Sequence, residues 1–127
     1  MYATVNSPML PAHLFAVGII LLIGTLIKIF PPKFSDKSYG YRTPLSIKDE
    51  EIWNEANRYS SNLFLTYSII FAVADFFGYL FVEGPLSIML PFFIFVLFLL
   101  SLIVVTEIHL KRFDKKRKNH TLAQQQN

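Results

Sequence analysis

The sequence contains no cysteine and few charged residues. None of its 127 residues is Cys, and Asp, Glu, Lys and Arg together make up only 17%. The absence of cysteine excludes a disulfide scaffold and a thiol-ligated metal site. The shortage of charge accompanies a hydrophobic share of 53%, which exceeds the share of about 45–50% found in ordinary soluble domains. This composition therefore excludes a soluble globule.

Three long apolar runs contain most of the hydrophobic residues. They cover about residues 12–30, 62–82 and 86–110, and their only charged residues are Lys28, Asp75 and Glu107. Each run is apolar on all faces and, as a helix, is long enough to cross a hydrocarbon layer of about 30 Å. The sequence thus predicts an all-α membrane protein, a single domain over residues 1–127 with three transmembrane helices.

The basic residues indicate how these spans are oriented. All 12 Lys and Arg residues lie at or after the end of the first run, in residues 28–58, or after the third run, in residues 111–118. The positive-inside rule then predicts an outer N-terminus, a cytoplasmic loop over residues 31–61 and a cytoplasmic basic tail over residues 111–127. No basic residue precedes the first run, which argues for a retained span and against a signal peptide. Because the basic residues report orientation, we expect no nucleic-acid partner.

The loop between the first two spans has the composition of a folded segment. Pro31 and Pro32 end the first helix, and residues 40–44 should form a defined turn. Ser46 followed by Asp49 has the form of a capping box, from which an uninterrupted helix can continue into the second span. An apolar stripe on this helix could lie against headgroups or neighbouring spans; it consists of Ile52, Trp53, Ala56, Tyr59 and Leu63.

Two stretches of this loop resemble a known family. Residues 39–46 read YGYRTPLS and residues 51–60 read EIWNEANRYS. A G-Y-R-T-P turn followed by a W-x-x-A-x-[RK] helix between two spans is similar to the signature of the SdpI family of small bacterial membrane proteins. The resemblance implies a bacterial inner-membrane protein of immunity type, and it marks as candidate binding residues Gly40, Tyr41, Arg42, Thr43, Pro44, Trp53, Asn57 and Arg58.

Ionisable residues inside predicted spans are candidates for function, because burying a charge in lipid costs about 2.5–3.5 kcal/mol on insertion scales. Asp75 is either a titratable or ligand-contacting carboxylate in a cavity, or a packing residue bonded to a hydroxyl or a backbone carbonyl. Lys28 and Glu107 lie at similar predicted depth, and we expect a structural ion pair between them; the alternative is that the lysine side chain extends alone to the interface. His13 should be an interfacial side chain, and Pro91 should kink or start a helix. Glu107 and His109 point apart on a helix, so we expect no metal site and no cofactor.

Loop and tail residues leave further alternatives open. Arg42 either binds a lipid phosphate or a partner carboxylate, or ties the turn to one of the nearby glutamates. Trp53 is expected as an interface anchor. The basic residues 111–118 either attract anionic lipid or only stop translocation, and residues 121–127 are expected to be disordered.

No pairing of a nucleophile with a base is recognisable, so we expect no enzyme. The first functional hypothesis is protection against a membrane-active peptide toxin, with the loop contacting a cytoplasmic regulator. The second is an accessory subunit of a larger membrane complex. A third and weaker hypothesis is a small transporter that uses Asp75, which would require a homo-oligomer because three spans enclose little volume.

Overall fold

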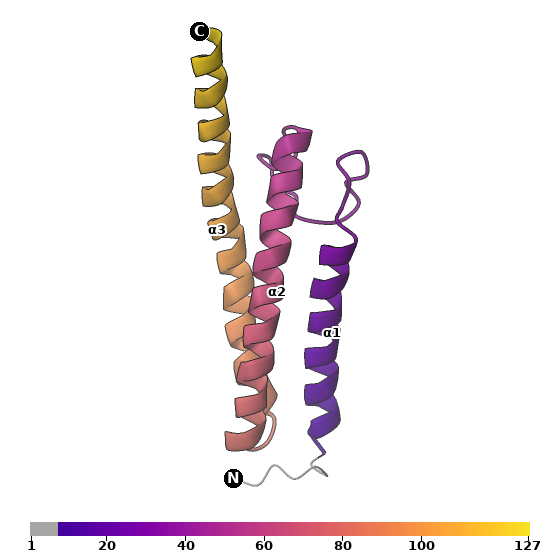
Figure 1. The fold of residues 1–127 in the computed structure, drawn as a ribbon. Coiled ribbons are helices and arrows are strands. Elements are labelled where there is room, and N and C mark those ends of the chain that lie inside the picture. Colours follow the sequence, from indigo (N-terminus) through magenta and orange to yellow (C-terminus); the bar gives the residue numbers. More distant parts are fainter. Residues whose placement is uncertain (1–7) are drawn as a thin grey trace.

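The computed structural model describes residues 8–127, and its regular elements are three helices (Figure 1). They are α1 (Leu10–Ile29), α2 (Glu50–Phe81) and α3 (Leu86–Gln125), and no strand occurs in this range. Each helix is long and apolar enough to cross a membrane. The predicted all-α fold with three spans is confirmed.

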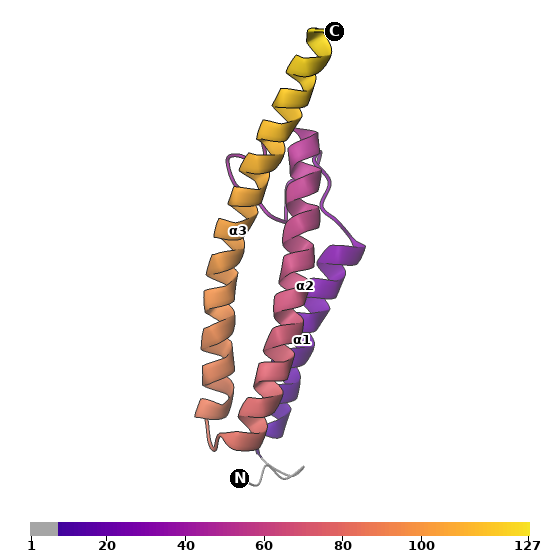
Figure 2. The ribbon, with the colours of Figure 1, turned by 60° about the vertical axis from the view of Figure 1, so that its left-hand side comes forward.

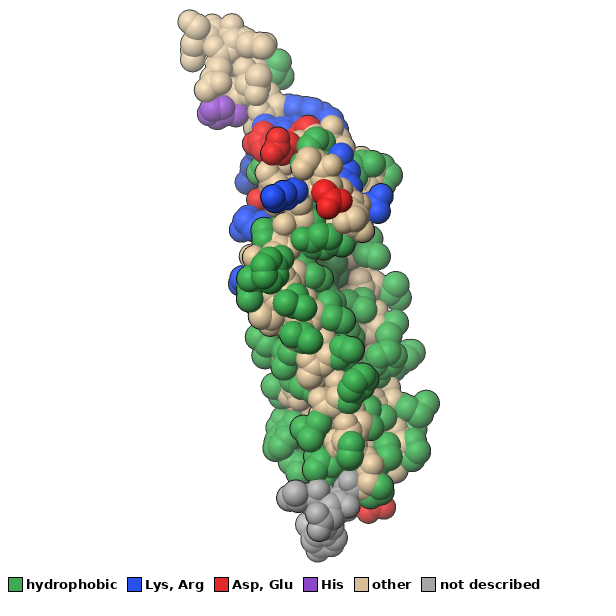
Figure 3. Space-filling model, turned by 90° about the vertical axis from the view of Figure 1, so that its right-hand side faces the viewer, with side chains coloured by type: hydrophobic (Ala, Val, Ile, Leu, Met, Phe, Trp, Pro, Cys, Tyr) green, Lys and Arg blue, Asp and Glu red, His purple; other side chains and the backbone are tan. Residues whose placement is uncertain are grey.

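The helix α2 is the central element, because it packs against both α1 and α3 (Figures 1 and 2). We call the end of the bundle that carries residues 30–49 the loop end, and the opposite end, with residues 82–85, the turn end. The last turns of α3 project past the loop end (Figure 2). The Lys and Arg side chains visible in Figure 3 gather at the loop end, above a surface of hydrophobic side chains.

Local signals explain where α1 and α2 begin and end. The helix α1 ends at Ile29, just before two prolines that cannot donate the next helical hydrogen bonds. The helix α2 begins after Asp49, whose carboxylate accepts a hydrogen bond from the Ile52 amide at 3.0 Å. From Glu50 the helix runs for 32 residues without interruption, which confirms that the loop helix continues into the second span.

The predicted role of Ser46 as helix cap was wrong. Asp49 caps α2, while Ser46 is fully buried three residues earlier. Its hydroxyl accepts a hydrogen bond from the Thr43 amide at 2.7 Å, and the Ser46 amide donates to Thr43 Oγ1 at 3.2 Å. Ser46 therefore closes a turn in the loop, and the aspartate meets the positive end of the helix dipole.

The expectation that residues 121–127 are disordered was also wrong. The helix α3 continues to Gln125, and the Thr121 hydroxyl donates to the Arg117 carbonyl at 3.1 Å. No glycine or proline occurs between Lys111 and Gln125, so nothing in the backbone interrupts the helix. A polar composition alone did not decide the structure of this segment.

Small residues allow the helices to approach each other closely at two places. A Cβ atom on Gly24 of α1 would crowd the ring of Phe64, and one on Gly78 of α2 would collide with the Ser87 carbonyl of α3. Gly78 thus permits a close approach of α2 and α3, as small residues do where helices pack in membranes. Pro91 lies inside α3, where it cannot donate to that same Ser87 carbonyl. Midway along the bundle the core consists of Ile20, Phe71 and Phe95, one residue from each helix.

Candidate functional site

The bend of the loop at Gly40 is held to α2 by an asparagine. Gly40 has a φ of +102°, and a Cβ atom at this position would collide with Asn57 Oδ1 and with Pro32. Only glycine fits this conformation and this approach without strain. The same Asn57 oxygen accepts a hydrogen bond from the Tyr41 amide at 2.7 Å, and Asn57 Nδ2 donates to the Trp53 carbonyl at 3.0 Å. Gly40 and Asn57 therefore fix where the loop meets α2.

Trp53 is not the interface anchor that the sequence predicts. Its side chain is 0% exposed, its Nε1 donates to the Pro32 carbonyl at 2.9 Å, and its ring lies edge-on to Phe34. Burial of the indole is favourable because its one polar atom has a partner. Trp53 thus fastens the start of the loop to α2, as Asn57 fastens the middle.

The hydrogen-bonded turn lies slightly later in the chain than predicted. Backbone hydrogen bonds join Ile47 to Thr43 and Lys48 to Leu45, so Thr43 begins the turn and Gly40 forms the bend before it. Pro44 and Arg42 are exposed on this loop. Among residues 8–127 Arg42 has no ion pair, so the predicted tie from Arg42 to a loop glutamate is not formed.

Tyr41 connects the loop to α3. Its one hydroxyl proton is shared between Glu107 Oε1 at 2.9 Å and the Ile103 carbonyl at 3.2 Å. Burial and this bond to Glu107 raise the pKa of Tyr41 above its ordinary value, so the phenol stays a donor. The predicted pair of Lys28 with Glu107 is not formed, because α2 lies between their helices and Glu107 takes its proton donor from the loop.

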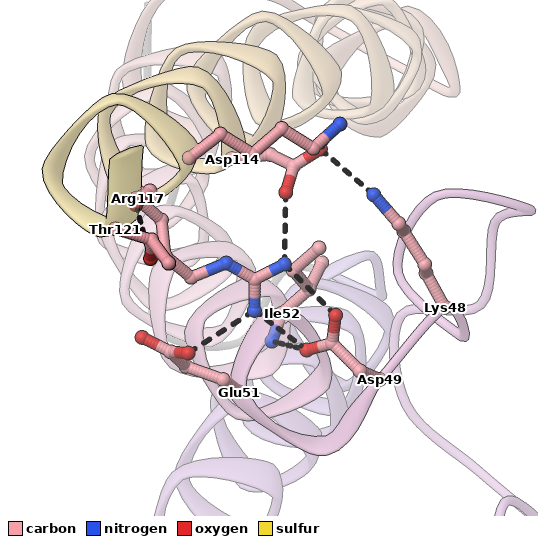
Figure 4. Close-up of polar contacts among 8 residues, drawn as sticks. Lys48, Asp49, Glu51, Ile52, Asp114, Arg117 and Thr121 are labelled. Atoms are coloured by element: carbon pink, nitrogen blue, oxygen red, sulfur yellow. Dashed lines mark hydrogen bonds and ion pairs between the residues drawn. The ribbon is translucent and has the colours of Figure 1, made fainter. Parts of the chain in front are cut away.

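A network of charged side chains joins the loop to the last part of α3 (Figure 4). Arg117 donates to both carboxylate oxygens of Asp49, each at 2.9 Å, and also to Glu51 at 3.1 Å and Asp114 at 2.8 Å. Lys48 donates to the other oxygen of Asp114 at 3.1 Å, and Lys118 pairs with that oxygen at 3.2 Å. We call these six residues the loop-end network.

The loop-end network changes the ionisation of its carboxyl groups. The hydrogen bond from Lys48, helped by Lys118 and Arg117 and opposed by burial, lowers the pKa of Asp114 to about 2. The hydrogen bonds from Arg117 lower the pKa of Asp49, the cap of α2. Both carboxylates are therefore charged in the folded protein at neutral pH.

Sequence reasoning missed this network. Asp114 is the only acidic residue among the basic residues 111–118, and its spacing to Arg117 and Lys118 is the three- and four-residue spacing of helical neighbours. That isolated acid was the available signal. The network engages two of the tail's basic residues; the others are exposed, namely Lys111, Arg112, Lys115 and Lys116.

At the turn end, one histidine ring joins all three helices. His13 of α1 is 3% exposed, and its Nδ1 lies 2.9 Å from both carboxylate oxygens of Asp75 on α2. Its Nε2 lies 3.0 Å from the Ser87 hydroxyl of α3. The prediction of an interfacial His13 was therefore wrong, and neither alternative for Asp75 had named a histidine as its partner. We call these three residues the turn-end cluster.

The Ser87 hydroxyl connects the turn-end cluster to the backbone. The Ser87 hydroxyl donates to the Gly84 carbonyl at 2.7 Å, so it accepts from Nε2–H of His13. The Asp75 carboxyl in turn has both of its oxygens within hydrogen-bonding distance of Nδ1, so the buried polar groups of the cluster are partners for one another, which lowers the cost of burying them.

A serine that contacts a histidine, which in turn contacts an aspartate, is also the arrangement of a hydrolytic triad. In this cluster, however, Ser87 is 2% exposed and its hydroxyl proton is used by the Gly84 carbonyl. A cleft of about 210 Å³ between α1 and α2 borders His13 and Asp75, and Ser87 does not line it. The cluster therefore joins helices and presents no accessible nucleophile.

His109 pairs with a glutamate of α2 and not with its neighbour Glu107. Its Nε2 lies 2.7 Å from Glu55 Oε1, and its ring stacks on Tyr59 with centroids 3.9 Å apart. Glu55 also accepts two hydrogen bonds from Arg58, at 2.8 and 3.1 Å. Of the predicted site residues, the loop motif thus comes together around α2, whereas Asp75 lies at the turn end. Lys28 borders a separate cleft with Arg58.

Comparison with known proteins identifies relatives for this arrangement. The sequence model of the SdpI/YfhL protein family matches residues 33–106, which contain the whole loop motif, α2 and most of the spanning part of α3. The chain is also 47% identical over 55 residues to a protein of Bacillus subtilis (strain 168) named "Uncharacterized protein YfhL". That match covers 43% of this chain and 50% of the relative, so the chain spans about half the length of the curated relative. No solved structure matches.

Proposed function

The chain belongs to the SdpI/YfhL protein family, and from this membership we propose that it protects a bacterial cell against a membrane-active peptide toxin. In this proposal it acts by binding, as an immunity protein of the inner membrane, and not as an enzyme. The helices meet the toxin within the bilayer, and the loop offers a surface to a cytoplasmic regulator.

One observation carries the proposal: the family motif builds a rigid surface on the loop. Gly40, Trp53 and Asn57 are used to hold the loop against α2, while Tyr41 ties it to α3. Arg42 and Pro44 are left exposed between these anchors. A free arginine on a fixed loop is suited to bind a carboxylate or phosphate of a partner, since little ordering entropy remains to be lost.

Protection is tested by survival. Deletion of the gene should sensitise cells to neighbouring bacteria that secrete killing peptides, and the wild-type gene should restore survival. Gly40→Ala should restore it poorly, because the new Cβ would collide with Asn57 and Pro32 at a positive φ. Gly18→Ala is the matched control, because a Cβ on Gly18 meets no atom within 4 Å. Unchanged survival of the deletion strain against all producers would refute the proposal.

The orientation is part of the same proposal. We place the loop end and the tail of α3 in the cytoplasm, because all 12 Lys and Arg residues lie in residues 28–58 or 111–118, at the end of α1, in the loop, in the first part of α2 or in the last part of α3. The chain lacks cysteine, so single cysteines can be introduced without background. A membrane-impermeant thiol reagent should label Glu83→Cys in intact spheroplasts and should label Ser35→Cys only after lysis. The reverse labelling pattern would invert the topology.

A further inference from the structure

A polar cleft opens at the loop end between α1 and α2. It has a volume of about 550 Å³, and two cations border it, Lys28 from α1 and Arg58 from α2. The amide side chains of Asn54 and Asn62 also line it. Asn54, Arg58 and Asn62 follow one another at four-residue steps, so they share one face of α2. We call this the loop-end cleft; it is separate from the loop-end network on α3.

The cations of the cleft lack a full complement of protein anions. Among residues 8–127, Lys28 has no ion pair, and no Asp or Glu lines the cleft. Arg58 pairs with Glu55, but that carboxylate also serves His109. The Asn54 and Asn62 amides have no hydrogen bond within the described chain. The cleft therefore presents positive charge and unused donors.

The position of Lys28 places this charge at the edge of the hydrocarbon layer. Lys28 is the second-last residue of the apolar helix α1, and Pro31 and Pro32, which also line the cleft, follow three and four residues later. A lysine at a helix end extends its stem along apolar surface and holds its ammonium at the level of the headgroups. The anionic group present at that level in every bilayer is the lipid phosphate.

We propose that the loop-end cleft binds the phosphate of an anionic phospholipid. Lys28 and Arg58 supply the charge, from two different helices, and the Asn54 and Asn62 amides donate to the remaining phosphate oxygens. Basic pockets between transmembrane helices are known to bind anionic headgroups. The bound lipid bridges α1 and α2 where the protein itself provides no ion pair between them. This inference requires neither the toxin nor a particular orientation.

The test offers the purified full-length protein, in mild detergent, equal amounts of phosphatidylglycerol and phosphatidylcholine with the same acyl chains. Native mass spectrometry counts the lipids retained. The wild type should prefer phosphatidylglycerol, and Lys28→Gln should lower that preference about fivefold, the factor that corresponds to one basic residue near an anionic headgroup. Lys28→Arg, which keeps the charge, should retain it.

The matched control removes the same charge elsewhere. Lys115 of the tail is exposed and lies outside the cleft, so Lys115→Gln should leave the preference unchanged. Equal losses in Lys28→Gln and Lys115→Gln would overturn the proposal, because the preference would then reflect net charge alone. Displacement of phosphatidylglycerol by millimolar inorganic phosphate would also overturn it, since the cleft would then recognise a free anion and not a lipid.

Discussion

The two ends of the bundle are held together by opposite electrostatic means. The loop-end network ties the loop and the start of α2 to α3, whereas the turn-end cluster ties all three helices together. The loop-end network uses six charged residues, several of which pair with more than one other member, and most of their side chains are exposed or half-exposed. The turn-end cluster uses one histidine ring and one carboxyl group, both shielded from solvent. Exposed ion pairs contribute little each, whereas a buried pair is costly to break. Stability at the loop end is therefore spread over many contacts, and at the turn end it depends on two residues.

The largest effect should follow from breaking the turn-end pair. His13→Ala leaves the Asp75 carboxyl buried without its partner, which we expect to lower the free energy of unfolding by about 3–5 kcal/mol. Thermal unfolding in detergent, followed by circular dichroism, measures the loss. The double variant His13→Leu/Asp75→Leu removes both polar groups and should recover much of it. A His13→Ala protein as stable as the wild type would show that the pair contributes nothing to stability.

A smaller effect should follow from removing the central cation of the loop-end network. Arg117→Gln loses the contacts to Asp49, Glu51 and Asp114, but the remaining lysines still compensate Asp114. We expect a loss of about 1 kcal/mol, together with faster hydrogen exchange in the last turns of α3. Arg112→Gln is the control, since Arg112 is exposed outside the network. Equal exchange rates in both variants would contradict the proposed anchoring of α3.

The smallest and most gradual effect should be a loss of stability at low pH. Because the pKa of Asp114 falls from 3.8 to about 2 on folding, the folded protein binds fewer protons there than the unfolded chain. This contribution to stability is fully present above about pH 4 and is lost as the pH falls towards about 2. Unfolding temperatures measured across this range should decline, and Asp114→Asn should decline less. An identical pH profile for both proteins would remove Asp114 from the explanation.

The sequence was sufficient to predict the three spans and the helix that continues from the loop into the membrane. Their signals are local: uninterrupted apolar length, two prolines after α1, and no helix breaker between residues 50 and 77. The motif resemblance likewise located the residues that fold the loop. What the sequence could not provide was the pairing between helices.

Those pairings depend on how the helices rotate and cross. The sequence marks Asp75 as a polar residue in a span, but its partner His13 lies 62 positions away. Similar depth predicts a pair of Lys28 with Glu107, yet α2 separates their helices. Residue type predicts that Trp53 lies at the interface, although its indole points inward and donates to the Pro32 carbonyl. A sequence indicates how deep a residue lies along a helix. Which neighbouring helix its side chain faces depends on how the helices pack, and the sequence does not give that.

The burial of Trp53 also means that tryptophan fluorescence reports on the state of the loop. It is the only tryptophan in the chain, and its emission therefore comes from one known place, between the start of the loop and α2. Any event that loosens the loop would expose the indole to water and shift its fluorescence emission to longer wavelength. Loosening of the loop can thus be followed in unlabelled protein.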